Sequence, residues 1–403
     1  MHFQNNNNQE RVTEHEKIRV LFVLNCLGVG GAETQVARIA PCFDKSLFDV
    51  QVAYYDDINL SHPADMLKNA GIKVTYLDRP RWGRFRYFFK AAAFIRGERF
   101  DVVHAFGGTT NLYARVPAIM AGVPVILGGL RGQADLGGIV SRLIYSLANW
   151  RCAGWIVNAG SLKTIAEQKL WFMKKRPVFV VLNGLELKDV RGAVKEGQRL
   201  FDEFRTDRPV VGTVGRLVPV KNHLLFVEMA SQIRDAGQDF DYWIIGDGPI
   251  RPEIEQAIRR RNLADRVRML GYRADVEPAL SRMDVFVLTS NTEGCPNVLL
   301  EAMRASLPVV ATNCTDLSEI IQDGVNSYIA PVGNARELAE KVKRILADTD
   351  LRRQMAINSR RIFEEKFNIS SAVKRMQDVY IDCIKRASKR NERLRMKLGG
   401  LGV

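Results

Sequence analysis

Short apolar runs alternate with longer amphipathic stretches along most of the 403-residue chain. The runs are rich in valine, isoleucine and leucine, which is typical of strands buried on both faces of a parallel sheet. Each run is followed by a helical pattern, so we predict a doubly wound α/β sheet. The strand candidates of the first half are IRVLFVLN (18–25), FDVQVAYY, IKVTYL, FDVVHAFG, PVILGGL, GWIVNAG and PVFVVLNG (177–184).

The alternation stops between residues 185 and 208, where the sequence is charged and has no strand pattern. We therefore predict two Rossmann-like domains, residues 18–187 and residues 209–365, joined by a linker at 188–208. The strand candidates of the second half are PVVGTVGRL (209–217), FDYWIIGDG, VRMLGY, DVFVLTS, LPVVATN and NSYIAPVG.

The two ends of the chain have different patterns. Residues 1–17 are polar and lack the apolar core of a signal peptide, so we predict a disordered tail. A long helical pattern covers about 351–388, and its part 366–388 should pack on the protein through one apolar face. Residues 389–403 are predicted as a basic tail. The apolar face consists of Val373, Met376, Val379, Tyr380 and Ile384.

Composition narrows the class of protein. With 46% hydrophobic and 26% charged residues the chain is typical of a soluble globular protein, and no apolar run is long enough to span a membrane. The six cysteines form no CxxC pair, so neither a zinc site nor a disulfide framework is indicated, and we expect a cytoplasmic protein. The net charge of +14 favours an acidic partner: nucleic acid, an anionic membrane or a phosphorylated substrate.

The first strand ends in a glycine loop, NCLGVGGAET, which includes Gly30 and Gly31. Glycines between a strand and a helix let the backbone approach a phosphate at the helix N-terminus. A plain turn would also explain the loop. A dinucleotide fingerprint needs glycine where Glu33 stands, which disfavours a nucleotide-dependent oxidoreductase.

The second domain opens with a similar loop, GTVGRLVPVKNH. Gly215 opens the backbone, and Arg216 and Lys221 are two cations that suit a diphosphate, although a solvated cationic turn is the alternative. Gly246, in GDGP, ends the next strand and so should lie at the crevice where open α/β sheets bind ligands.

Two glutamates flank a glycine and a proline in EGCPNVLLEAM, residues 293–303. We predict that Asn297 caps a helix starting near Val298, with Glu293 in the loop before it and Glu301 in its first turns. Glu301 could simply favour the helix N-terminus, and the two carboxylates could be the acid and nucleophile of a glycoside hydrolase.

Taken in order, these motifs resemble those of the family 4 retaining glycosyltransferases, over about residues 18–388. The match includes the early glycine loop, GRLVPVKNH, GDGP, GYRADV, EGCPNVLLEAM and LSEIIQDGVNSYIAPVG. The resemblance implies the GT-B fold: two Rossmann-like doubly wound parallel-sheet domains that face a central cleft. It also implies that helix 366–388 returns to the N-terminal domain.

The resemblance further implies residue roles. Arg216 and Lys221 would hold the donor diphosphate, and with Glu293, beside the donor sugar, they would form the catalytic group. Glu301 would bind the ribose hydroxyls of the nucleotide. The remaining donor contacts are loop glycines, backbone N–H groups and a strand end against the base: Gly30, Gly31, Gly215, Gly246, Tyr272, Arg273, Cys295, Asn297 and Val298.

By the same resemblance, we expect a metal-independent enzyme without a cofactor. The donor would be a nucleotide-sugar, UDP-linked and with an N-acetylhexosamine as candidate, and the acceptor a lipid-linked or cell-surface glycan. Many family members have an acceptor-side histidine where this chain has Gly129 and Arg131. We assign Arg131 and His104, at the end of the preceding strand, to the acceptor side. A noncatalytic GT-B homologue is the alternative, as is the oxidoreductase.

A DxD sequence, Asp239 and Asp241, resembles the metal motif of another glycosyltransferase fold. It precedes a strand instead of ending one, so we interpret it as a solvated turn and expect no divalent metal.

Residues 79–100 interleave arginines with aromatic residues, five of which lie between positions 82 and 89. This pattern fits a helix at a membrane interface, whereas packing of the aromatic residues on the sheet is the alternative. No nucleic-acid recognition motif accompanies it. We hypothesise peripheral binding to the inner, anionic face of the cytoplasmic membrane, with no nucleic acid as partner. These five aromatic residues are Trp82, Phe85, Tyr87, Phe88 and Phe89.

Overall fold

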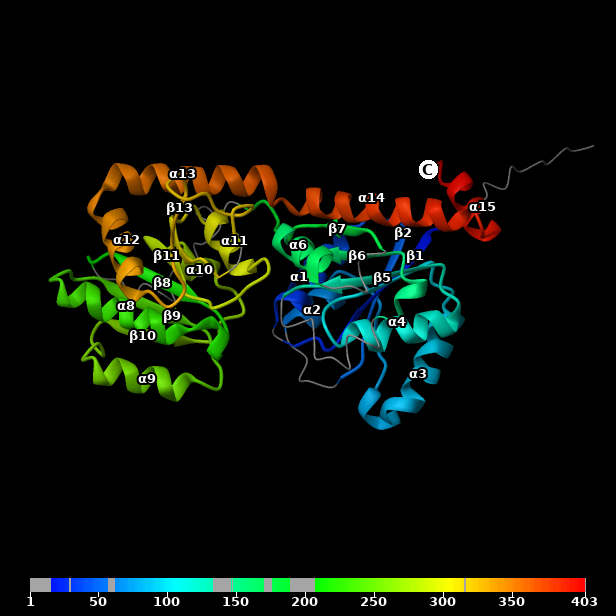
Figure 1. Cartoon of the computed structure of the whole chain (residues 1–403), viewed down its shortest axis with the longest axis horizontal. Helices are drawn as coiled ribbons and strands as arrows, with labels where there is room; N and C mark the ends of the chain where they lie inside the picture. The colour runs from blue at the N-terminus through cyan, green and yellow to red at the C-terminus, as the bar shows by residue number, and fades with distance from the viewer. Residues whose placement is uncertain are drawn as a thin grey trace, which may run out of the picture.

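Two lobes lie side by side along the longest axis of the computed structural model (Figure 1). Nearly all of the predicted N-terminal tail and most of the predicted linker fall outside the described residues. The structure describes residues 16–28, 30–56, 62–132, 146, 148–169, 176–188, 207–314 and 317–402.

The N-terminal lobe contains a seven-stranded parallel sheet of order β3-β2-β1-β4-β5-β6-β7. The order reverses between β1 and β4, which in open α/β sheets places ligands at the carboxyl ends of these strands. The strands are β1 (Ile18–Leu24), β2 (Phe48–Tyr54), β3 (Val74–Tyr76), β4 (Val102–Ala105), β5 (Val125–Leu130), β6 (Gly154–Val157) and β7 (Val178–Val180).

Helices cover both faces of this sheet. In β1, Phe22 points to the core formed with α1 and α14, whereas Val23 points to the core formed with α3 and α4. Because both faces are buried, β1 is an almost continuous apolar run, interrupted by Arg19 near its start. The helices of this half are α1 (Gly31–Ile39), η1 (Ala40–Cys42), α2 (His62–Asn69), α3 (Arg79–Gly97), α4 (Thr110–Ala121), η3 (Asn149–Arg151) and α6 (Gly160–Lys169).

The C-terminal lobe repeats this design with a six-stranded parallel sheet of order β10-β9-β8-β11-β12-β13. The predicted two-domain parallel architecture is therefore confirmed. The strands are β8 (Val210–Val214), β9 (Asp241–Ile245), β10 (Val267–Gly271), β11 (Val285–Leu288), β12 (Val309–Thr312) and β13 (Ser327–Ala330).

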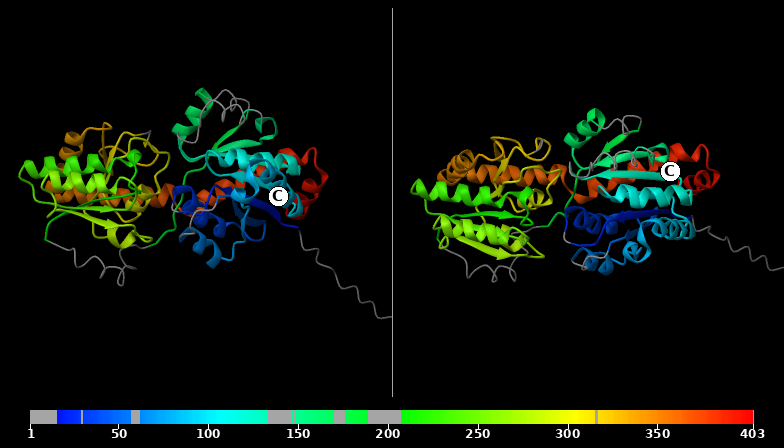
Figure 2. Two further views of the ribbon diagram at one scale, coloured as in Figure 1. Left: turned by 90° about the horizontal axis from the view of Figure 1, so that it is seen from below. Right: turned by 60° about the horizontal axis from the view of Figure 1, so that its bottom comes forward.

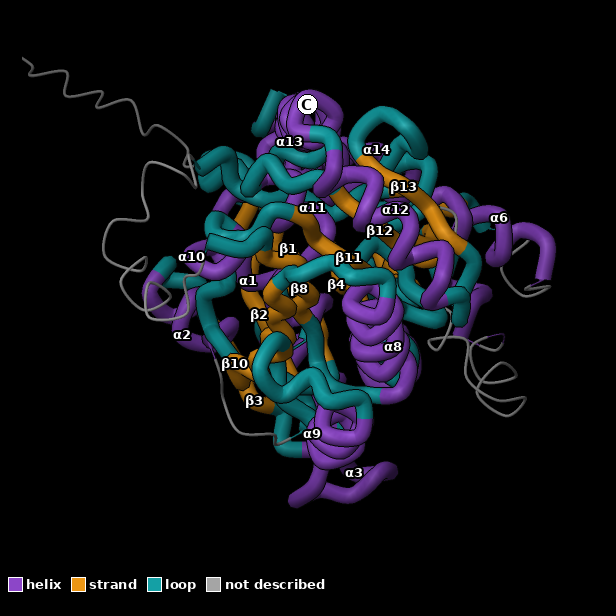
Figure 3. The backbone as a smooth tube through the Cα atoms, turned by 90° about the vertical axis from the view of Figure 1, so that its left-hand side faces the viewer, coloured by secondary structure: helices purple, strands orange, loops and turns teal. Residues whose placement is uncertain are grey.

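Figure 3 shows α8 and α12 on one side of these strands and α10 on the other. The two faces correspond to two separate cores, one with α8, α9 and α12 and one with α10, α11 and α13. The bounds are η4 (Pro219–Lys221), α8 (His223–Asp235), α9 (Arg251–Arg260), α10 (Glu277–Leu280), α11 (Asn297–Arg304), α12 (Ala335–Ala347) and α13 (Thr349–Lys366).

The helical pattern predicted at about 351–388 is not one helix. It divides into α13 and α14 (Ile369–Ser388) at Phe367 and Asn368, where the Asn368 side chain accepts a hydrogen bond from the backbone N–H of Ser370 (3.0 Å) and caps the second helix. Figures 1 and 2 show α14 leaving the C-terminal lobe and lying along the N-terminal lobe. All five residues of its predicted apolar face are buried there, which confirms that expectation.

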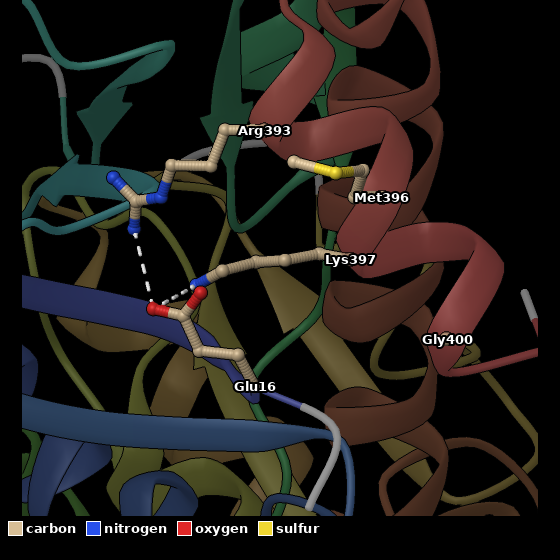
Figure 4. Close-up of a pocket in the computed structure, with 5 residues that line it drawn as sticks. All are labelled: Glu16, Arg393, Met396, Lys397 and Gly400. Carbon is tan, nitrogen blue, oxygen red and sulfur yellow. Dashed lines mark ion pairs between the residues drawn. The ribbon is translucent and has the colours of Figure 1, made fainter. Parts of the chain in front are cut away.

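The segment predicted only as a basic tail contains a further helix, α15 (Glu392–Gly400). Its Lys397 is buried and places Nζ 2.9 Å from the carboxylate of Asp101, which is also buried. Arg393 lies 3.2 Å from the same carboxylate. Figure 4 shows Arg393 and Lys397 also reaching Glu16. A buried ion pair therefore docks α15 at the amino ends of β1 and β4.

The DxD interpretation is wrong for Asp241. This residue is the first of β9, is buried, and accepts a hydrogen bond from Arg208 (3.2 Å). Asp239 is exposed as predicted and pairs with Arg266 (2.6 Å). Both carboxylates lie at the amino end of the strand, the edge opposite to the loops described below.

We predict that Lys397→Ala lowers the free energy of unfolding by about 2–4 kcal/mol, because it leaves the buried Asp101 carboxylate without its buried partner. Thermal or urea denaturation measures this change. Met396→Ala is the matched control, since Met396 lies on the same helix but is 67% exposed. Equal stabilities of the two variants would contradict a role of the ion pair in docking α15.

Candidate active site

The loop after β8 and the loop after β9 are joined backbone to backbone. The N–H of Leu217 donates to the carbonyl of Asp247 (3.0 Å), and the N–H of Ile250 donates to that of Leu217 (3.2 Å). Gly246 has φ 142°, and a Cβ there would lie 1.9 Å from the carbonyl oxygen of Gly215. Glycine is therefore required at Gly246, and the two loops form one surface at the carboxyl edge of the sheet.

Lys221 and Glu293 are brought together on this surface. Lys221 ends η4, and its Nζ lies 2.5 Å from Oε1 of Glu293, to which Ser290 also donates a hydrogen bond (2.6 Å). Arg216 is exposed nearby in sequence, and its side chain makes no ion pair within the described ranges. The two predicted catalytic cations therefore have different surroundings. Lys221 is paired with Glu293, the predicted catalytic carboxylate, whereas Arg216 faces solvent.

The prediction that Asn297 caps the following helix is wrong. Helix α11 already includes Asn297, Pro296 is in the N-cap position, and no side chain caps the helix. The Asn297 side chain is instead used between the domains, where Nδ2 donates to the carbonyl of Gly31 (3.0 Å). Cys295 is buried, and this burial raises the pKa of its thiol to about 12, so it stays neutral. Val298 is half-buried beside it.

A directional chain of hydrogen bonds connects the two domains at this point. Arg131 Nη1 donates to Oδ1 of Asn183 (3.1 Å), and Asn183 Nδ2 donates to Oδ1 of Asn297 (2.7 Å) and to the carbonyl of Cys295 (3.1 Å). Asn297 in turn donates to Gly31. Since arginine can only donate, it sets the orientation of each amide along the chain. Arg131, predicted on the acceptor side, is thus connected to the predicted donor loop.

Gly294 allows the close approach that this chain needs. A Cβ on Gly294 would lie 2.2 Å from the carbonyl oxygen of Arg131 and 3.1 Å from Oδ1 of Asn158. That Oδ1 atom is buried and has no hydrogen-bond partner within the described residues. The loop 293–297 is therefore pressed against the ends of β5 and β6 of the other domain.

Two further polar contacts cross between the domains. Arg38, in the last turn of α1, places Nη2 2.8 Å from Oε1 of Glu301. Glu319 accepts a hydrogen bond (2.7 Å) from the backbone N–H of Gly160, the first residue of α6. A carboxylate at a helix N-terminus is favoured by the helix dipole. Glu301, the predicted ribose ligand, is thus held by a residue of the opposite domain.

His104 lies behind Arg131 and not on an open surface. It is fully buried, and its Nδ1 lies 2.7 Å from the hydroxyl of Tyr380 on α14. Burial, and then the nearby Arg131, hold the pKa of the imidazole well below its usual range, so the ring is neutral. Arg131 stacks on Phe106 with its Cζ 4.6 Å from the ring centroid. In these contacts His104 is a buried residue that packs behind Arg131. Its acceptor-side role stays a prediction.

The remaining predicted positions lie at strand ends. Tyr272 is exposed after β10, and Arg273 donates to the carbonyl of Leu270 (3.1 Å). In the first glycine loop, the carboxylate of Glu33 folds over Gly30, where a Cβ would lie 2.1 Å from Oε2. The side chain of Glu33 thus occupies the position at which a dinucleotide fingerprint needs glycine, which disfavours the oxidoreductase alternative.

The sequence reasoning missed Arg38, Asn158, Asn183 and Glu319. Asn158 and Asn183 each follow closely after an apolar strand pattern, so the sequence could have placed both at the carboxyl edge of the sheet, where ligands bind. Arg38 and Glu319 had no such signal, because each meets its partner only through the placement of the two domains.

The family models match both halves of this arrangement. Residues 30–160 match the Glycosyl transferase 4-like domain, and residues 208–348 match Glycosyl transferases group 1. A 2-deoxystreptamine glucosyltransferase of Streptomyces kanamyceticus is 31% identical over 262 residues, which is 61% of this chain and 67% of that protein. The chain belongs to the family 4 glycosyltransferases. The predicted family is confirmed, and with it glycosyl transfer as the class of reaction.

Other family members extend the comparison over most of the chain. An Escherichia coli UDP-Gal:alpha-D-GlcNAc-diphosphoundecaprenol alpha-1,3-galactosyltransferase is 26% identical over 302 residues, 72% of this chain and 77% of that enzyme. The crystal structure of Anabaena HepE in complex with UDP and glucose has a TM-score of 0.78 at 20% identity and covers 91% of this chain and all of that one. The predicted GT-B fold is thereby confirmed.

The hydrogen-bond chain through Asn183 generates a prediction for this glycosyltransferase. Asn183→Asp keeps an acceptor for Arg131 but loses the donor to Cys295 and Asn297, and it places a carboxylate against two oxygens. We expect the Tm to fall by about 2–6 °C. The radius of gyration from small-angle X-ray scattering should increase, because the domains separate.

The control is Asn358→Asp. This change removes a similar amide-to-carbonyl hydrogen bond, to Val325 (2.9 Å), within one domain. The radius of gyration of this variant should match that of the wild type. An unchanged radius in Asn183→Asp as well would show that the chain does not hold the domains together.

Proposed function

We propose that this enzyme transfers a sugar from a UDP-linked donor, with an N-acetylhexosamine as first candidate, to a lipid-linked glycan. The transfer retains the anomeric configuration and uses no divalent metal. The observation that carries the proposal is the assembly of Arg216, Lys221, Glu293 and Glu301 at one carboxyl edge, within one domain. Two cations and two carboxylates there match the charges and hydroxyls of a nucleotide-sugar.

The two cations supply the charge that departure of the nucleoside diphosphate requires. Lys221 pairs with Glu293, so a diphosphate would exchange one anionic partner of Lys221 for another. Arg216 faces solvent next to the loop and adds a second positive group. Helix α11 begins at Asn297, directly after the loop that holds Glu293, and its N-terminus adds partial positive charge there. These groups stabilise negative charge where it develops, which lowers the barrier to bond cleavage.

Retention follows if the acceptor attacks from the face that the diphosphate leaves. Loop 293–297 lies against Arg131 and Asn183 of the N-terminal domain, so an acceptor on that domain would be next to the sugar. The Glu293 carboxylate is already engaged by Lys221 and Ser290. We therefore assign the acceptor proton to the leaving phosphate oxygen, and Glu293 to orientation of the sugar and of Lys221.

The lipid-linked acceptor is supported by the surface of α3. The helix is broken at Gly83, and beyond the break Phe85 is 84% exposed and Phe89 is 69% exposed. Arg86 and Lys90 are exposed on the same segment. Tyr87 is buried against α4. Some aromatic residues of this segment therefore pack inside the protein, whereas others are exposed, as a membrane-binding surface requires.

A membrane attachment through α3 would be peripheral. Within the described ranges, no helix has the length and apolarity needed to cross a bilayer. The Escherichia coli relative is named for an acceptor on diphosphoundecaprenol, a membrane lipid. Aromatic rings flanked by cations suit the interface of an anionic membrane, and we propose that α3 binds the cytoplasmic face of one.

A thermal-shift panel of UDP-, GDP- and ADP-sugars tests the donor. We expect UDP-N-acetylhexosamines at about 100 times their Kd to stabilise the protein by about 2.7 kcal/mol, and the other nucleotides to do less. Lys221→Ala should lose most of this shift and lower transfer at least about 100-fold, because it removes a charge that stabilises the leaving group.

Lys163→Ala is the matched control, since Lys163 is half exposed on α6 and its ion pair among the described residues is an (i, i+4) contact with Glu167. It should behave as the wild type. Full transfer activity in a folded Lys221→Ala variant would refute the assignment of the site.

Co-sedimentation with liposomes tests the α3 surface. The double variant Phe85→Ser/Phe89→Ser should partition at least about tenfold less onto phosphatidylglycerol vesicles, because two exposed rings are lost from the interface. Ile357→Ser, at a 52% exposed position of α13, is the control and should not change binding. Equal wild-type recovery with neutral and anionic vesicles would rule out the proposed anionic surface.

A further inference from the structure

Arg38 of the N-terminal domain contacts Glu301, the residue predicted to bind the ribose. Its Nη2 lies 2.8 Å from Oε1 of Glu301, and only 18% of the Arg38 side chain and 11% of the Glu301 side chain are exposed. Residues 38 and 301 come from α1 and α11, so the pair exists only when the domains meet. An ion pair shielded in this way is stronger than one on an open surface.

The pair leaves one hydrogen-bond acceptor and one donor unused. Within the described residues, the hydrogen bond of Glu301 is made by Oε1, and its Oε2 makes none. Nη1 of Arg38 is buried and also has no hydrogen-bond partner there. A buried guanidinium N–H without a partner is costly, so such an atom is expected to meet an acceptor when the site is filled.

Arg304 does not compete for Glu301, although it lies three residues further along α11. Its Nη1 donates to the carbonyl of Glu186 (3.1 Å), and its Nη2 pairs with Glu277. Burial, the largest cause, lowers the pKa of the Arg304 guanidinium, while Glu277 acts in the opposite direction. Arg304 is therefore committed elsewhere, and Arg38 is the cation that holds Glu301.

An unused acceptor beside an unused donor matches a vicinal diol. The 2′ and 3′ hydroxyls of a ribose each donate and accept, so one can donate to Glu301 Oε2 while the other accepts from Arg38 Nη1. We propose that Arg38 is a specificity-determining residue for the nucleotide, which together with Glu301 recognises the ribose diol. The proposal rests on the proposed function, because it places the nucleotide at Glu301. It makes ribose recognition a property of both domains.

The test compares nucleoside diphosphates with their 2′-deoxy forms. Isothermal titration calorimetry measures Kd for UDP and 2′-deoxy-UDP, and for the GDP and ADP pairs, with the wild type and with Arg38→Ala. The wild type should prefer the ribonucleotide at least about tenfold, as expected for a lost hydrogen bond to a charged group. In Arg38→Ala the preference should fall to within about twofold, because the carboxylate is no longer held and the second donor is lost.

Arg38→Lys separates charge from geometry. Lysine keeps the positive charge but has no planar fork, so it can hold Glu301 without offering the second N–H in the same plane. We expect this variant to retain part of the preference for ribose. It also covers the case in which Arg38→Ala fails to fold, which circular dichroism would show.

Glu319→Gln is the control for domain contact in general. It weakens the hydrogen bond from Gly160, which also crosses between the domains but involves none of the nucleotide residues. Its ratio of ribose to deoxyribose affinity should equal that of the wild type. If Arg38→Ala weakens both nucleotides equally and keeps the ratio, Arg38 acts only in domain closure and the inference is overturned. If the wild type binds no nucleoside diphosphate, the proposed function itself fails.

Discussion

The relative placement of the two domains depends on hydrogen bonds at the point where the chain crosses between them. Leu185 leaves the first domain, and its N–H donates to the carbonyl of Phe367 while its carbonyl accepts from the N–H of Ile369, both at 2.9 Å. Gly184 packs on the same turn, where a Cβ would lie 2.8 Å from Cα of Ile369. The outgoing and returning segments are thus paired, and α14 is then buried along the first sheet. The carboxyl edges of the two sheets meet as a result.

Where these edges meet, opposite charges and complementary polar groups satisfy one another. Lys221 pairs with Glu293, and Arg38 pairs with Glu301. Largely buried charges are tolerated when they are paired, and both pairs meet this requirement. In our proposal, the donor diphosphate replaces Glu293 as the partner of Lys221, whereas the ribose uses the remaining atoms of the Arg38–Glu301 pair, which stays formed. Donor binding and association of the domains would then be coupled through Arg38 and Glu301.

The fold could be predicted because its cause is local. Strands buried on both faces are continuous apolar runs, and their alternation with helices specifies two doubly wound sheets. The family followed from the order of short motifs. The predictions for Asn297 and Asp241 were wrong because the contacts of these residues are not local. The Asn297 side chain hydrogen-bonds to Asn183 and Gly31, far away in the sequence, and Asp241 is buried against Arg208. Helix α15 was not predicted, because its docking depends on the buried Lys397 and a lysine in a basic terminal segment is typical of an exposed tail.

We propose that the residues pairing across and within this edge form the nucleotide site. The crystal structure of the protein with bound UDP tests it most directly. The account predicts the diphosphate at Arg216 and Lys221, with Lys221 released from Glu293, and the ribose hydroxyls within hydrogen-bond distance of Glu301 and Arg38. UDP bound at another surface, with the pairs Lys221–Glu293 and Arg38–Glu301 unchanged, would contradict it.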